Sequence, residues 1–169
     1  MDKAITTVLL TIAGVVCALF IFNSVYPAVH LGGGAISGIS GKLSERIKSR
    51  IDIIHVAGEL DSSGNWQDTN DNGLFDVFVW VKNTGLVDLA PVKDGDVFFG
   101  PEGNFTRIPH EEYASGYPRW TYEVENGAEW EPGTTIKIDI QYDSALSSGN
   151  YYVKFITQNG VSDEEYFSM

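Results

Sequence analysis

An uncharged apolar run near the N-terminus constrains this chain more than any other feature. From Ala4 to Phe22 the sequence reads AITTVLLTIAGVVCALFIF, without a single Asp, Glu, Lys or Arg. At the helical rise of about 1.5 Å per residue, a helix of this length approaches the roughly 30 Å hydrocarbon core of a bilayer. The run is too long, and the segment before it too short, for a cleaved secretory signal. It therefore predicts a membrane-inserted helix.

Hydropathy leaves two roles open for this helix. It can be a plain membrane anchor, or it can leave the membrane and pack against copies of itself in the core of a filament, because both roles need an apolar surface all round. Small residues such as Gly14 and Ala18 allow close approach between helices, which favours packing. In the filament interpretation the core positions are Ile5, Val8, Leu9, Ile12, Val15, Val16, Leu19 and Phe20.

A second helical segment follows the apolar run. Pro27 and the triplet Gly32-Gly33-Gly34 predict a kink or an interruption. Beyond them apolar residues recur at helical spacing, at positions Ile36, Ile39, Leu43, Ile47 and Ile51. A stripe of this kind needs a partner, either the chain's own head domain or a neighbouring subunit. We expect residues 1–52 to form a long, kinked stalk helix.

Past Asp52 the apolar period changes from that of a helix to that of a strand. Residues 136–142 alternate apolar and polar side chains, and Phe75–Lys82 is apolar on both faces and ends at the turn Asn83-Thr84-Gly85. Further strands are expected near 53–60, 96–100, 120–125, 151–156 and 164–168. About seven strands predict an immunoglobulin-like antiparallel β-sandwich over residues 53–169. The fold class is α+β.

Charge separates the same two parts. Up to Asp52 five basic residues accompany three acidic ones, whereas the remainder holds six basic and twenty acidic residues. This split indicates two environments, and the net charge of −12 argues against nucleic acid as a partner. The single cysteine, Cys17, lies in the apolar run, so the head has no disulfide and depends on its core.

One loop carries a calcium-binding pattern. In Asp68-Thr69-Asn70-Asp71-Asn72-Gly73-Leu74-Phe75-Asp76, oxygen-bearing side chains stand at positions 1, 3 and 5, a glycine follows, and an aspartate stands at position 9. Position 12 is Val79, so the segment is not an EF-hand. The sequence predicts a structural Ca²⁺ site formed by Asp68, Asn70, Asn72 and Asp76; the alternative is a solvated hairpin loop.

Other chemical motifs are few. Asn104-Phe105-Thr106 is an N-glycosylation sequon, which makes Asn104 a candidate glycan site. His30, His55 and His110 have no zinc-ligand spacing, and no phosphate-binding loop or catalytic triad order is present in the sequence. We therefore expect a protein that is not an enzyme.

Three further segments are ITTVLLTIAGVV (Ile5–Val16), VFVWVKNTG (Val77–Gly85) and GNYYVKFITQNGVSDEEYFS (Gly149–Ser168). Together they resemble the archaellum proteins, both archaellins and the FlaG/FlaF type, which share a type IV pilin-like N-terminal helix. They lie at both ends and in the middle, so the resemblance spans essentially the whole chain.

The resemblance implies one of two structural roles. In archaellins the helices bundle into a filament core and the sandwiches form its surface. In the stator proteins the helix stays in the membrane and the sandwich binds the surface layer. We expect first a self-assembling filament subunit, membrane-inserted before assembly and extracellular afterwards, and second a stator anchored in the membrane. A tethered glycan-binding sandwich has less support.

Overall fold

The N-terminal segment is one helix. The structure, a computed structural model that describes residues 2–169, gives α1 from Asp2 to Lys48. Pro27 lies inside α1, and the helix continues through Gly32–Gly34, so the interruption considered at the glycines is absent. Each glycine costs a helix about 1 kcal/mol relative to alanine but does not forbid helical backbone angles. The chain divides into two compact units, Met1–Leu43 and Ser44–Met169.

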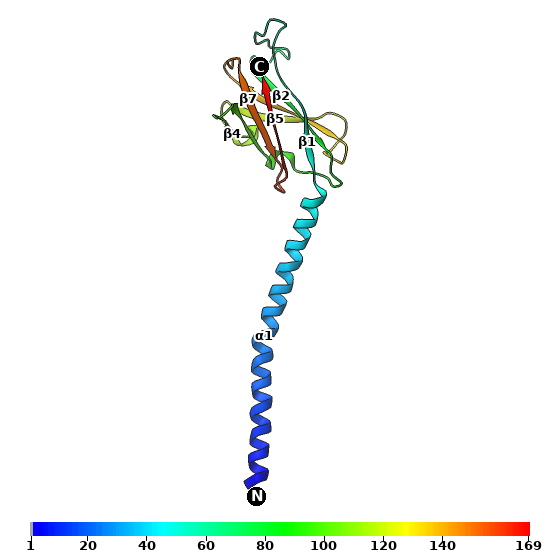
Figure 1. The fold of residues 1–169 in the computed structure, drawn as a ribbon, viewed down its shortest axis with the longest axis vertical. Helices are drawn as coiled ribbons and strands as arrows, with labels where there is room; N and C mark the ends of the chain where they lie inside the picture. The colour runs from blue at the N-terminus through cyan, green and yellow to red at the C-terminus, as the bar shows by residue number, and fades with distance from the viewer. Residues whose placement is uncertain (1) are drawn as a thin grey trace. The chain divides into compact units, whose positions relative to one another are not determined.

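The second unit contains two antiparallel four-stranded sheets (Figure 1). One has the order β1-β2-β6-β5, formed by Ile51–Gly58, Phe75–Asn83, Thr135–Tyr142 and Arg119–Val124. The other has the order β4-β3-β7-β8, formed by Thr106–Ile108, Asp96–Pro101, Asn150–Ile156 and Ser162–Ser168. Short 3-10 turns, η1 (Val92–Asp94) and η2 (Glu111–Tyr113), lie in the connections. The seven expected strands are present within two residues of the predicted ends, and the three-residue β4 is an addition.

The core lies between the two sheets. Val77, Val79 and Val81 of β2 pair in register with three isoleucines of β6, and all six side chains are at most 1% exposed. Phe99 and Phe155 from the other sheet meet this surface; the Phe155 and Trp120 rings lie 6.0 Å apart across the core. Burying each such side chain contributes roughly 1.5–3 kcal/mol. The β-sandwich prediction is confirmed.

Hydrogen bonds fix the point where the chain enters the sandwich. The backbone N–H of Leu86 donates to the carbonyl oxygen of Lys48 at 2.8 Å, and that of Thr84 donates to the carbonyl oxygen of Arg50 at 2.9 Å. A Cβ on Gly85 would lie 2.6 Å from the backbone of Arg50 and of Lys48, so only glycine fits there. The turn Asn83-Thr84-Gly85 therefore holds the start of β1.

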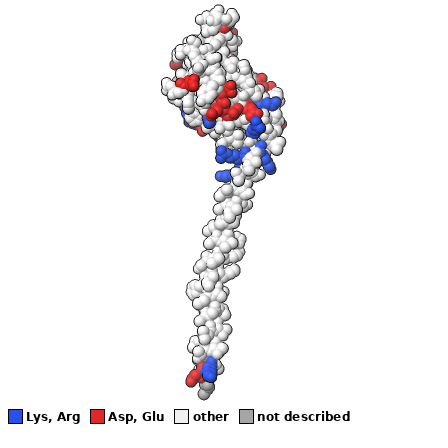
Figure 2. Space-filling view, in the orientation of Figure 1, with Lys and Arg blue, Asp and Glu red and all other residues white. Residues whose placement is uncertain are grey.

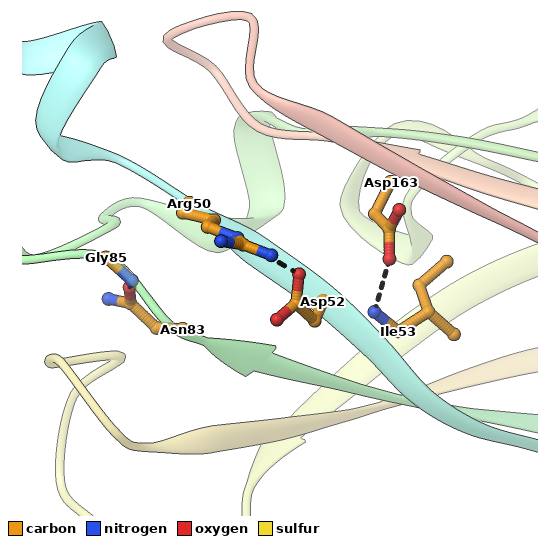
Figure 3. A network of polar contacts seen from close by, with 6 residues as sticks. All are labelled: Arg50, Asp52, Ile53, Asn83, Gly85 and Asp163. Atoms are coloured by element: carbon orange, nitrogen blue, oxygen red, sulfur yellow. Dashed lines mark hydrogen bonds and ion pairs between the residues drawn. The ribbon is translucent and has the colours of Figure 1, made fainter.

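Polar side chains complete this junction (Figure 3). The fully buried Asn83 accepts from the Gly85 N–H at 3.0 Å and donates to two backbone carbonyls. Arg50 and Asp52 form an exposed ion pair at 3.4 Å. The N–H of Ile53 donates to the Asp163 carboxylate on β8 at 2.6 Å, which ties an edge strand of one sheet to an edge strand of the other.

We expect a fragment spanning Ser44–Met169 to fold by itself, and Ile138→Ala to lower its free energy of unfolding by about 2–5 kcal/mol, because the truncation leaves a cavity in the core. Urea unfolding followed by circular dichroism measures the change. Ile54→Ala is the matched control, since Ile54 is 55% exposed and its truncation should cost no more than about 0.5 kcal/mol. Equal losses for the two variants would contradict the assignment of the core.

Candidate functional site

The surface of α1 is the first candidate for a binding site. All eight predicted core positions are exposed, from 43% for Val16 to 69% for Phe20. Within residues 2–169, α1 is the one helix long and apolar enough to cross a membrane. Exposing such a surface to water costs about 25 cal/mol of free energy per Å² of apolar area. It therefore requires lipid or other helices around it.

The apolar surface is longer than a bilayer is thick. No Asp, Glu, Lys or Arg lies between Lys3 and Lys42, and that part of α1 is uncharged in Figure 2. The uncharged residues 4–41 correspond to about 57 Å of helix, nearly twice the hydrocarbon core, and the whole of α1, with 47 residues, to about 70 Å. Further residues of the apolar stripe stay 55–74% exposed: Ile36, Ile39, Leu43 and Ile47. Lipid alone does not cover the whole length of α1.

The second candidate is the loop between β1 and β2. The structure brings the four predicted calcium ligands together around a network of hydrogen bonds. The Nδ2 groups of Asn70 and Asn72 both donate to Asp76 Oδ2, at 2.8 and 2.7 Å. The two oxygens of Asp68 accept the backbone N–H groups of Asn72 and Gly73, at 3.1 and 2.8 Å. Asp76 is completely buried at the start of β2.

Two further carboxylates belong to this cluster, and sequence spacing did not identify them. Glu59 follows β1 and is 3% exposed; its Oε1 accepts from the backbone N–H of Thr69 at 3.1 Å and from the Thr69 hydroxyl. Asp139 lies on β6 and accepts from Gln141 Nε2 at 3.3 Å. The only available signal was an acidic residue in the otherwise regular alternation of residues 136–142, which also fits a solvated face.

Electrostatics couples the members of the cluster. Burial raises the pKa of the Asp139 carboxyl from 3.8 to about 7, and the negative charges of Asp76 and Glu59 act in the same direction. The Gln141 hydrogen bond and the charge of Lys137 oppose this shift of the pKa. Across residues 2–169, no three His, Cys, Asp or Glu side chains are already gathered as a metal-binding group. The Ca²⁺ site in this loop stays a prediction.

The histidines do not form a site. His30 lies on α1, His55 on β1, and His110 precedes η2. His110 is buried against Trp120, with ring centroids 4.5 Å apart, and its Nδ1 accepts the N–H of Glu112. Burial lowers the pKa of His110, which keeps the ring neutral. Its role is to cap η2.

This architecture is similar to that of several solved protein structures. No family model matches the chain. An uncharacterized protein of Archaeoglobus fulgidus is 29% identical over 173 residues, which cover 98% of both chains. The archaellum periplasmic stator protein FlaG of Sulfolobus acidocaldarius is 22% identical, with a TM-score of 0.55 over 70% of this chain and 99% of that one. In the FlaF–FlaG stator complex of the same organism the values are 24% and 0.52, over 70% of this chain and 88% of that one.

An archaellin has a similar structure. Archaeal flagellin FlaB1 of Methanocaldococcus jannaschii is 12% identical, with a TM-score of 0.51 over 72% of this chain and 90% of that one. This chain has an archaellum-protein fold. The resemblance noted in the sequence is thereby confirmed at the level of structure. The neighbours of this archaellum-type sandwich are structural components rather than enzymes.

The candidate glycan site lies on the surface of the archaellum-type sandwich. Asn104 is exposed in the turn between β3 and β4, and its backbone N–H donates to the carbonyl oxygen of Pro101 at 2.8 Å. The side chain is accessible to a modifying enzyme, and glycosylation of Asn104 stays a prediction.

Asp139 gives the archaellum-type head a specific pH dependence. Folding raises the pKa of Asp139, so between about pH 4 and pH 7 the carboxyl is protonated in the folded chain and ionised in the unfolded chain. The contribution of Asp139 to the free energy of unfolding therefore falls as the pH rises through this window. Asp139→Asn should therefore raise the melting temperature relative to wild type more at pH 8 than at pH 5. Thermal melts of the full-length protein in detergent with EDTA measure this difference. A difference that is the same at both pH values would show that Asp139 titrates normally.

Proposed function

We propose that this chain is a structural subunit of an archaellum, of the membrane-anchored stator type, with α1 in the membrane and the sandwich outside the cell against an envelope protein. The observation that carries the proposal is the structural match to FlaG over 70% of this chain and 99% of the solved FlaG chain. The identities to FlaG and to the FlaF–FlaG complex, 22% and 24%, are about twice the 12% to FlaB1.

The junction at the base of the sandwich suits a part that bears load. The last turn of α1, from Ser44 to Lys48, belongs to the same compact unit as the sheets. Besides the bonds from the Asn83–Gly85 turn, Asn159 Nδ2 donates to Ser49 Oγ at 2.6 Å and Arg46 donates to the carbonyl oxygen of Gly160 at 3.2 Å. These hydrogen bonds tie the last turn of α1 to the sandwich within this unit. A protein that holds a motor against the envelope needs such a connection.

The surface of α1 beyond the bilayer predicts a helical partner. About half of α1 suffices to span the hydrocarbon core, which leaves the exposed stripe Ile36, Ile39, Leu43 and Ile47 outside it. The glycines at positions 38 and 41 adjoin this stripe and would let a second helix approach closely. In the stator interpretation the partner is a helix of another stator subunit.

The same stripe supports a second candidate function, a filament subunit. In a filament, copies of α1 would cover one another along their whole length, and the apolar surface would need no lipid. Shearing of cells separates the two functions, because a filament subunit would be recovered in sheared fibres seen by electron microscopy. A stator would stay with the membrane and be released by detergent. Recovery as the main component of fibres would overturn the stator proposal.

We expect Leu19→Asp to abolish co-flotation of the full-length protein with lipid vesicles. A buried leucine contributes roughly 1.5–3 kcal/mol, and an aspartate at the centre of a membrane helix costs about 2.5–3.5 kcal/mol. Leu19→Ile is the matched control and should float like wild type. If the Asp variant floated normally, the first half of α1 would not be the membrane-inserted segment.

A further inference from the structure

Three carboxylates in the β1–β2 region each keep one oxygen without a hydrogen-bond partner. Among the buried side-chain atoms of residues 2–169, Glu59 Oε2, Asp76 Oδ1 and Asp139 Oδ1 have no donor. Glu59 and Asp76 are 3% and 0% exposed, so water does not replace the missing donors freely. A buried carboxylate oxygen without a partner costs free energy. Three such atoms in one region call for a common explanation.

The strand register places the three carboxylates on one face of the sheet. Asp76 pairs with Gln141, and Asp139 lies two residues from Gln141 on β6, so Asp76 and Asp139 share the face opposite the buried valines. The register Gly58–Val77 puts Glu59 beside Asp76, and the Glu59 N–H donates to the Asp76 carbonyl oxygen at 3.2 Å. Glu59 directly after β1, Asp76 on β2 and Asp139 on β6 therefore lie at the same end of the outer face.

The β1–β2 loop covers this end of the sheet. It satisfies one oxygen of Glu59 through Thr69 and one oxygen of Asp76 through Asn70 and Asn72. The opposite oxygens of the same two carboxylates remain without donors. The loop turns sharply at Asp71 and Gly73, whose φ angles are 58° and 74°. The amide oxygens of Asn70 and Asn72 accept backbone N–H groups of the loop itself, so the loop leaves the free oxygens of Glu59 and Asp76 unpaired.

We propose that the unpaired oxygens of Glu59, Asp76 and Asp139 bind a divalent cation of the calcium class beneath the loop Asp68–Asp76, with water as the remaining ligands. Ca²⁺ takes six to eight oxygen ligands, carboxylates and waters among them, in a flexible arrangement. The absence of His and Cys from the cluster disfavours zinc. The three carboxylates do not yet surround one point, so binding draws their free oxygens together.

This ligand set differs from the one read from loop spacing. Both oxygens of Asp68 accept backbone N–H groups of the loop, so Asp68 shapes the turn. Glu59 and Asp139 take its place and connect the loop to two neighbouring strands. The cation would lock the β1–β2 loop onto the sheet, whether the chain acts as a stator or in a filament.

Thermal melting of the full-length protein in detergent, with CaCl₂ or with EGTA at equal ionic strength, tests the proposal. At a hundredfold excess of Ca²⁺ over Kd, we expect the melting temperature to rise on the order of 8 °C. Tb³⁺, which takes the same oxygen ligands, provides a direct titration through luminescence sensitised by the tryptophans.

Four variants assign the site. Glu59→Gln and Asp139→Asn should each raise the Kd for Ca²⁺ at least about tenfold, a loss of about 1.4 kcal/mol. Glu123→Gln removes the same charge from an exposed position on β5 and should leave the Kd unchanged. Asp68→Asn should change it less than the two ligand variants do.

Three results would overturn the proposal. The first is a melting temperature of the wild type that is identical in CaCl₂ and EGTA, with no saturable Tb³⁺ signal. The second is a Ca²⁺ response that survives in the double variant Glu59→Gln with Asp139→Asn, and the third concerns Asp68. If only Asp68→Asn abolished the response, the ion would sit in the loop alone and the sheet carboxylates would not be ligands.

Discussion

The pairing of β2 with β6 organises the rest of the sandwich. Because side chains alternate along a strand, burial of Val77, Val79 and Val81 against the other sheet commits Asp76, Phe78 and Trp80 to the outer face. The partner strand obeys the same rule, so the buried isoleucines of β6 send Lys137 and Asp139 outward. The ammonium group of Lys137 then lies 4.3 Å from the Phe78 ring centroid. One hydrophobic ladder thereby determines an aromatic, basic and acidic outer face.

The other constraint is the apolar length of α1. The uncharged part of α1, residues 4–41, is longer than the hydrocarbon core of a bilayer and too apolar to be stable in water, so part of it needs a cover other than lipid. The fold shared with stator proteins and with an archaellin fits this requirement, since both kinds of protein are parts of an assembly. The choice between the two roles depends on what covers the stripe from Ile36 to Ile47. The hydrogen-bonded junction at Asn83–Gly85 serves either role.

The sequence predicted the elements well where the pattern was long and regular. The alternation in β6 and β7, the change of period after Asp52 and the turn at Asn83–Gly85 each reappear in the structure. β4 was missed because three residues are too short for a period to be recognised. Of the kink or interruption considered at glycines 32–34, the interruption is absent and one long helix forms as expected, because the low helix propensity of glycine is a modest cost per residue.

The features that could be predicted from the sequence are local or periodic: the apolar helix, the strands, the sandwich and the loop rich in Asp and Asn. Such features depend on residues a few positions apart, and their spacing is visible in one dimension. Tertiary structure alone decided that Glu59 and Asp139, which are eighty positions apart in the chain, lie on the same face as Asp76. Strand order and register set that proximity. From the sequence alone, without strand order and register, Asp139 would be interpreted as an ordinary solvated residue. In the structure, burial beside two other carboxylates raises its pKa to about 7.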